Sequence, residues 1–322
     1  MTMRVIGCWL AFMLTVALQS SAFTAEPAVV AEDPDFAIQG EYQGEISEAG
    51  VKRKAGVQVI ALGKGKFRSV GFWGGLPGDG RETSDMLEWK GETTNGVTAL
   101  EGKGFRARIE ASSIIVEDKS EIVGKLARIV RRSPTLNAKP PRDAVVLFDG
   151  TSAESFVNGQ ITADKLLMPG TTTKASFQSG TLHVEFQIPF APDVASRGNS
   201  GVYLQSRYEV QILDSIGFAP HNHECGGIPS VKAADVTMSF PPLSWQTYDV
   251  EFTAAQFRDG KKEKNSRMTV RHNGVVIHDN VEVPHVTTSA PLAEGPEPGP
   301  INFQEHGAQV RFRNIWFLPR AN

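Results

Sequence analysis

The sequence predicts an all-β protein in which a small β-domain precedes a larger antiparallel β-sandwich. Apolar and polar residues alternate strictly over several segments of the second half, which indicates strands with one buried face and one face in water. No segment of that half repeats apolar residues at helical spacing over ten residues. The 31 glycines and 19 prolines suit a fold with many tight turns.

Residues 1–22 have the features of a cleavable secretory signal peptide. Arg4 is the only charge before an apolar run from Val5 to Leu18, and small residues then permit cleavage after Ala22. The alternative is a retained anchor, but about 14 apolar residues are fewer than the roughly 20 that a membrane span needs. We therefore expect a periplasmic or secreted protein with no membrane span in the mature chain.

Length, charge and cysteine content narrow the class of protein further. The 322 residues allow two domains of ordinary size, and a net charge of -3 gives no electrostatic footprint for nucleic acid. Loss of the signal peptide leaves Cys225 as the only cysteine. An intrachain disulfide is then impossible, so packing must stabilise the fold.

The first domain is expected at residues 36–135, after a leader at 23–35 that has no apolar periodicity. Residues 74–80 are so rich in Gly and Pro that they must form a loop. Residues 136–142 include two adjacent prolines and predict an extended linker. Strand-like runs of this domain are 57–62, 66–73 and 114–116.

The second domain, residues 143–322, has the clearer strand pattern. Asn273-Gly274 between two apolar runs is the strongest hairpin signal of the chain. Two antiparallel sheets packed face to face would bury the apolar faces of its strands. The alternating segments are 182–188, 202–212, which we expect to form one long strand, and 247–252.

The polar face of the expected 202–212 strand indicates a carbohydrate ligand. It carries an aromatic ring, amides, a guanidinium and a carboxylate in a row, and Asp214 follows the end of the strand. Amides and carboxylates bind sugar hydroxyls, and an aromatic ring covers the C–H side of a sugar. The row consists of Tyr203, Gln205, Arg207, Glu209 and Gln211.

Glu209, Asp214 and His306 are candidates for acid/base catalysis. In a straight strand, five positions span roughly 17 Å. Paired carboxylates of glycosidases lie about 5–9.5 Å apart, so Glu209 and Asp214 would need a bulge to act as a pair. His306 is included because histidine transfers protons readily near neutral pH. The alternatives are a solvated face, an ion pair with Arg207, or a histidine bonded within a turn.

The segment from His221 to Cys225 places four possible metal ligands within five residues. Transition-metal sites mostly draw their ligands from separate elements. We therefore expect a polar loop at the rim of the sheet, and no metal or cofactor.

Motifs of the second half occur in the order that one family shows. From about 143 to 319, the chain resembles the 3-keto-disaccharide hydrolase domain family, formerly a domain of unknown function. The preceding residues resemble a companion domain of planctomycete-type members. The motifs are 198–204, 208–215, 224–228, 245–250, 273–280, 299–301, 306–307 and 310–316.

The resemblance implies a concanavalin A-like jelly roll, export to the periplasm and cleavage of 3-keto-glycosides. Pro229 stands where the family often has an aromatic residue, and Glu305 where it often has Asp, so Pro229 is expected to change the pocket wall. The candidate catalytic residues are Glu209, Asp214 and His306. The candidate substrate-binding residues are Asn199, Tyr203, Arg207, Gln211, Trp245, Gln304, Arg311 and Arg313.

A mechanism follows from the implied substrate. A ketone at C3 acidifies the C2 proton, so a base can remove it, the enolate can expel the group at C1, and water then adds. Hydrolysis by two carboxylates is the competing mechanism. A lectin-like module without turnover, or a structural interaction protein, is the competing function. The sequence leaves each catalytic role open between residues. The base is Glu209 or His306, and the acid is Asp214 or His306. The enolate oxyanion is stabilised by Arg311, Arg313 or Gln211.

Overall fold

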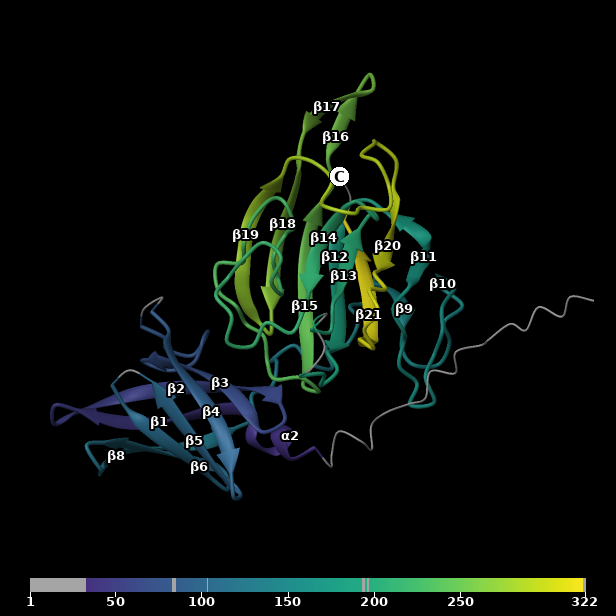
Figure 1. The fold of residues 1–322 in the computed structure, drawn as a ribbon. Helices are drawn as coiled ribbons and strands as arrows, with labels where there is room; N and C mark the ends of the chain where they lie inside the picture. The colour runs from purple at the N-terminus through teal and green to yellow at the C-terminus, as the bar shows by residue number, and fades with distance from the viewer. Residues whose placement is uncertain (1–32, 83–84, 103, 193–194, 196, 321–322) are drawn as a thin grey trace, which may run out of the picture.

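The computed structural model describes residues 33–82, 85–102, 104–192, 195 and 197–320 (Figure 1). The predicted signal peptide, its cleavage site and most of the leader lie outside these residues. No helix within the described ranges is long and apolar enough to span a membrane. The chain forms a β-barrel followed by a jelly-roll β-sandwich, which confirms the predicted fold class.

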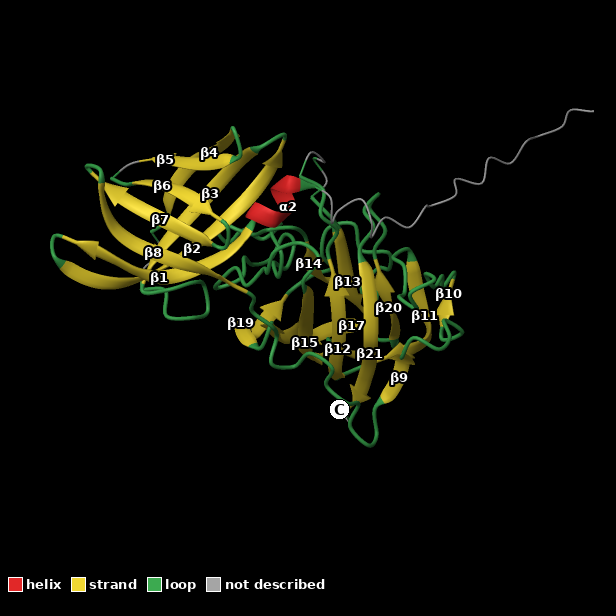
Figure 2. Cartoon of the chain, turned by 90° about the horizontal axis from the view of Figure 1, so that it is seen from below, coloured by secondary structure: helices red, strands yellow, loops and turns green. Residues whose placement is uncertain are grey.

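The first unit is a closed barrel of eight antiparallel strands. Each strand pairs with the next along the chain, and β8 closes the barrel against β1. A short helix, α2 (Pro34–Ile38), precedes the barrel and lies at its junction with the sandwich (Figure 2). The strands are β1 (Gly40–Glu48), β2 (Val51–Gly63), β3 (Lys66–Trp73), β4 (Leu87–Thr94), β5 (Val97–Gly102), β6 (Arg106–Glu110), β7 (Ser113–Asp118) and β8 (Glu121–Ile129).

The second unit packs two antiparallel sheets against each other. The five-stranded sheet has the order β10-β11-β20-β13-β14, and the six-stranded sheet has the order β19-β18-β15-β12-β21-β9. β16 and β17 form a separate hairpin. The strands are β9 (Val145–Phe148), β10 (Phe156–Val157), β11 (Thr171–Phe177), β12 (Gly180–Gln187), β13 (Ser200–Leu204), β14 (Tyr208–Ile212), β15 (Trp245–Thr253), β16 (Gln256–Arg258), β17 (Lys261–Lys264), β18 (Ser266–His272), β19 (Val275–Val283), β20 (Gly299–Phe303) and β21 (Arg311–Pro319).

The core of the sandwich lies between the two sheets, where the alternating sequence places it. Val184 and Phe186 of β12 and Val202 and Val210 of the facing sheet are fully buried there. The Asn273-Gly274 turn joins β18 to β19 with φ of 50° and 80°, as its sequence predicts. Local turn chemistry and strand periodicity therefore agree with the tertiary packing.

The segment 202–212 is a hairpin, so the expectation of one long strand is wrong. β13 pairs with β14 and places Tyr203 opposite Glu209. The turn is centred on Ser206, and Gln205 and Ser206 adopt left-handed φ of 54° and 52°. Because positions opposite each other are both odd or both even, the apolar alternation continues through the turn and conceals it. The turn also lacks the Asn-Gly signal.

The outer faces of both sheets are covered near their middle, so the expectation that they face water is wrong there. Glu185 of the six-stranded sheet is 0% exposed, because residues 133–138 between the two units lie across it. Glu209 of the five-stranded sheet is 3% exposed, beside the chain at Thr287. In both places, the covering segment buries side chains that the strand pattern alone would place in water.

Candidate functional site

The outer face of the five-stranded sheet gathers polar residues from three strands. Tyr203 on β13 lies directly opposite Glu209 on β14. Gln304 follows β20, and its backbone N–H donates to the Gly201 carbonyl over 2.9 Å. Its side-chain Nε2 lies 3.1 Å from the Tyr203 hydroxyl, to which it donates. The structure thus brings together three of the residues that the sequence singles out.

Glu209 is a buried carboxyl without a complete set of partners. Its Oε1 atom is buried and has no hydrogen-bond partner among the described residues. Burial raises the pKa of the Glu209 carboxyl to about 7, and the nearby Tyr203 hydroxyl opposes this shift only in part. A carboxyl that changes protonation near neutral pH can act as a general base or acid.

Gly201 makes room for this carboxyl, which sequence reasoning did not identify. A Cβ atom at Gly201 would lie only 2.0 Å from Glu209 Oε1. A glycine within a strand often marks such a close approach, and this was the available signal. The carboxyl therefore lies against the backbone of β13.

Gln211 and Asn199 extend the polar surface along the same end of the sheet. Gln211 shares the face of Glu209, and its Oε1 accepts from the Ile212 N–H over 3.1 Å. The Nε2 group of Gln211 is then the part that can donate to a ligand. Asn199 directly precedes β13, and its buried Oδ1 atom has no partner in the described part of the chain.

Asp214 follows β14 and is held by a loop that contains Arg197. The Asp214 N–H donates to the Arg197 carbonyl over 2.8 Å, and Arg197 Nη1 donates back to the Asp214 carbonyl over 3.0 Å. Burial raises the pKa of the Asp214 carboxyl to about 7, against the Ile216 N–H and the Arg197 charge. Asp214 is therefore a second carboxyl that titrates near neutral pH. β14 pairs with β13 without a register shift, so no bulge between residues 208 and 212 brings Asp214 toward Glu209.

Glu224 anchors this loop and was not among the predicted site residues. It forms an ion pair with Arg197 at 3.0 Å and accepts from the Ser215 hydroxyl over 2.6 Å. The adjacent Cys225 is buried, with its Sγ atom 3.1 Å from the Tyr248 hydroxyl. Glu224 and Cys225, at the C-terminal end of the 221–225 segment, therefore make two separate structural contacts.

His221 and His223 in the same segment are exposed. Their ring centroids lie 5.6 Å apart. No group of three His, Cys, Asp or Glu side chains in the described ranges could hold a metal ion.

His306 lies in an exposed turn after β20, two residues beyond Gln304. In the same turn, Glu305 accepts the Gly307 N–H over 2.7 Å. His306 is thus at the solvent end of the polar face. Pro229 follows the segment Gly226–Gly227, which pairs with Gln211 along the open edge of β14.

Arg207 lies at the opposite end of the hairpin, away from Asp214. Its guanidinium donates to the carbonyls of Ala293 and Glu297, each over 2.8 Å. These bonds fix a loop over the sheet edge. The side chain is 6% exposed and is occupied by structural contacts.

Trp245, Arg311 and Arg313 lie on the outer face of the other, six-stranded sheet. The Arg313 guanidinium stacks on Trp245 at 3.9 Å and donates to Glu185 over 2.7 Å. Arg311 donates to Gln309 over 2.9 Å. The packed core separates this face from Glu209, so these three residues do not join the cluster. Strand periodicity defines two faces but not the sheet to which a strand belongs.

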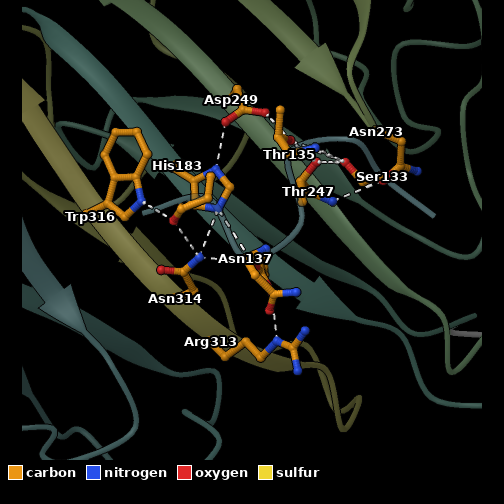
Figure 3. A network of polar contacts seen from close by, with 12 residues as sticks. Ser133, Thr135, Asn137, His183, Thr247, Asp249, Asn273, Arg313, Asn314 and Trp316 are labelled. Atoms are coloured by element: carbon orange, nitrogen blue, oxygen red, sulfur yellow. Dashed lines mark hydrogen bonds and ion pairs between the residues drawn. The ribbon is translucent and has the colours of Figure 1, made fainter. Parts of the chain in front are cut away.

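The six-stranded face has a polar network of its own (Figure 3). His183 Nδ1 lies 2.6 Å from Asp249 Oδ1, and Asn314 donates to Glu185 over 2.9 Å. Burial alone would raise the pKa of Glu185, but hydrogen bonds from His183, Asn314, Arg313 and Asn137 lower it to about 2. The network is fully partnered and holds residues 133–138 on the sheet.

The fold and the cluster around Glu209 define a β-sandwich with buried groups suited to acid/base chemistry. A family model for the 3-keto-alpha-glucoside-1,2-lyase-like domain matches residues 143–318. The match covers more than half of the chain, and the chain belongs to this carbohydrate-acting family. The resemblance found in the sequence is therefore confirmed.

One solved structure shows the same sandwich. A crystal structure of a candidate glycosyl hydrolase from Parabacteroides distasonis ATCC 8503 is 29% identical, with a TM-score of 0.50, and the match covers 56% of this chain and 85% of that one. A second candidate glycosyl hydrolase from the same organism is 15% identical, with a TM-score of 0.41, over 55% of this chain and 94% of that one. No curated protein matches significantly.

Proposed function

We propose that the sandwich cleaves 3-keto-glycosides and that Glu209 is the base that removes the C2 proton. Family membership supports the substrate class. The observation that carries the proposal is the Glu209 carboxyl, which is buried, has no hydrogen-bond partner at Oε1 within the described part of the chain, and has a pKa raised to about 7. A base with this pKa is half ionised near neutral pH, where it can accept a proton from a carbon acidified by a neighbouring ketone.

The reaction then proceeds by elimination and hydration. Glu209 takes the C2 proton, and the electron pair of the C–H bond forms an enolate whose charge rests on the C3 oxygen. The enolate expels the oxygen at C1, which takes a proton from a general acid, for which Asp214 and His306 are the candidates. Water adds to C1 of the resulting enone, and C2 regains a proton. The sum is hydrolysis of the glycosidic bond.

The neighbouring polar groups would orient the sugar and stabilise the enolate. The Gln211 Nε2 group and the Gln304 amide are donors on the same face as Glu209. The Tyr203 hydroxyl stays protonated, because burial raises its pKa far above the ordinary value. His306, at the solvent end, is the second candidate for the acid.

Turnover of oxidised sugars separates this function from its alternatives. The protein is incubated with 3-keto-trehalose and 3-keto-sucrose, with unoxidised trehalose and sucrose as controls, between about pH 5 and pH 8. We expect monosaccharide release from the keto-sugars alone. Release from the unoxidised sugars would instead indicate hydrolysis by paired carboxylates, and binding without release would indicate a lectin-like module.

We also propose export, supported by the apolar run from Val5 to Leu18 and the small residues that follow it. The mature protein recovered outside the cytoplasm should then begin at Phe23. Recovery of the chain with Met1 intact in the cytoplasm would contradict this.

A further inference from the structure

The barrel contacts the sandwich at the segment that directly follows Asp214. Ile216 is 1% exposed and packs in a hydrophobic cluster whose other buried members all belong to the barrel. Those members are Ile60, Val70, Phe72 and Leu76. The Ile216 side chain, two residues from Asp214, therefore packs against the outer surface of the barrel.

The barrel also satisfies both backbone polar groups of Gly217. The Gln58 Oε1 atom accepts the Gly217 N–H over 3.0 Å, and Arg68 donates to the Gly217 carbonyl over 2.8 Å. Gly217 has φ of 71°, and a Cβ atom there would lie 2.6 Å from Ile60 Cδ1. Only glycine combines this conformation with so close an approach to the barrel.

Gln58 is held in the orientation that makes it an acceptor toward Gly217. Its Nε2 group donates to Glu41 Oε1 over 2.9 Å within the barrel. Glu41 is in turn paired with Arg131 and is 1% exposed. A buried amide whose donor end is fixed in this way presents its oxygen to the sandwich with little freedom to rotate.

An aromatic ring continues the contact from the barrel to Arg197. The Phe218 ring has the Arg68 guanidinium at 4.9 Å and the Arg197 guanidinium at 4.3 Å from its centroid. Arg197 donates to the Asp214 carbonyl and forms an ion pair with Glu224. Contacts therefore run without interruption from strand β3 of the barrel to the backbone of Asp214.

We propose that the barrel is a working part of the candidate site and that Arg68 and Gln58 are positioning residues for Asp214. They hold residues 216–218 against the barrel, and this segment holds Arg197 and the Asp214 backbone in place. The proposal rests on the proposed function, since Asp214 is a candidate acid of that reaction. It assigns the first unit a role in catalysis by the second.

The test compares Arg68→Ala with Lys66→Ala. Lys66 lies on the same strand and face as Arg68, is exposed, and forms no hydrogen bond or ion pair with the sandwich among the described residues, so it controls for loss of a surface charge. Arg68→Lys keeps the charge but not the planar, multiply bonding guanidinium. Gln58→Ala removes the second contact. Hydrogen exchange of the 214–218 peptide and kcat and KM on 3-keto-trehalose are measured for each protein.

We expect Arg68→Ala to raise exchange at 216–218 and to lower kcat about tenfold, the size of one lost hydrogen bond to a charged group, with KM nearly unchanged. Arg68→Lys should recover part of the loss, and Lys66→Ala should match the wild type. Unchanged exchange in both Arg68→Ala and Gln58→Ala would overturn the proposal even if the wild type shows no turnover. Raised exchange with wild-type kcat would overturn it as well. Absence of wild-type turnover would by itself count against the proposed function only.

Discussion

The two outer faces of the sandwich carry similar residue types, but the pKa values of their central carboxyl groups are shifted in opposite directions. On the six-stranded sheet, Glu185 is surrounded by donors, and its pKa is lowered to about 2. On the five-stranded sheet, Glu209 is almost as deeply buried, yet none of the residues that the structure describes bonds to its Oε1, and its pKa is raised to about 7. The first carboxylate fixes residues 133–138 in place, whereas the second is free to exchange a proton.

Hydrogen-bond partners, and not residue types, distinguish the structural network from the reactive site. Both faces combine aromatic, amide and carboxylate groups, and the six-stranded face also has a histidine paired with a carboxylate at 2.6 Å. Burial without compensation favours the neutral carboxyl, whereas burial with several donors favours the charged one.

The largest effect is expected for Glu209→Gln. The amide fits the same space but cannot remove a proton from C2, so kcat on 3-keto-trehalose should fall by a factor of about 10² to 10⁴. The measurement is steady-state release of glucose, with circular dichroism to confirm the fold. A loss below about threefold would show that another group is the base.

Glu185→Gln should instead reduce stability. The substitution removes the charge that Arg313 and His183 face in a fully buried setting, and the free energy of unfolding should fall by about 3 kcal/mol. Urea unfolding followed by tryptophan fluorescence measures this. If the variant is as stable as the wild type, the network does not hold the residues that cross the sheet.

The pH dependence of stability should differ in sign between the two carboxyls. Glu209 has a pKa of about 7 in the folded protein against an ordinary value of 4.5, so its contribution to the free energy of unfolding is present below pH 4.5 and is lost as pH rises through about 7. Glu185 has a pKa of about 2 in the folded protein, so its contribution to the free energy of unfolding is present above pH 4.5 and is lost as pH falls toward 2.

Unfolding free energies of the wild type and Glu209→Gln, measured from pH 5 to pH 8, test this contrast. As pH rises, the free energy of unfolding of the variant should increase relative to that of the wild type, by up to about 3 kcal/mol. Parallel curves would mean that the Glu209 carboxyl is not perturbed in the folded protein.

The smallest effect is expected for Trp245→Ala. Trp245 stacks with Arg313 on the six-stranded face, away from Glu209, so kcat and KM should stay within about twofold of the wild type. A KM raised tenfold or more would show that the substrate reaches this face. That result would show that both outer faces of the sandwich contribute to substrate binding.

Much of the fold was predictable from the sequence. The alternation at 182–188 and the Asn273-Gly274 turn are local signals, and both formed as expected. The hairpin at Ser206 was not predictable, because its register keeps the apolar residues in phase. Closure of the barrel by β1 and β8 depends on pairing between distant segments, on which periodicity is silent.

The candidate site was predictable in its residue types more than in its arrangement. Tyr203, Glu209 and Gln211 share a face as the alternation indicates. Trp245 and Arg313 lie on the other sheet, because the choice of sheet is decided by tertiary topology. The role of Gly201 depends on a side chain across the strand pair and becomes visible only in three dimensions.

Deuterium incorporation at C2 tests the assignment of Glu209 most directly. The wild type and Glu209→Gln act on 3-keto-trehalose in D2O, with the 3-keto product alone as a control for spontaneous exchange, and C2 is followed by NMR. We predict one deuterium at C2 in the product of the wild type and no enzyme-dependent exchange with the variant. Product that retains its original C2 proton, or exchange by the variant at the wild-type rate, would contradict the account.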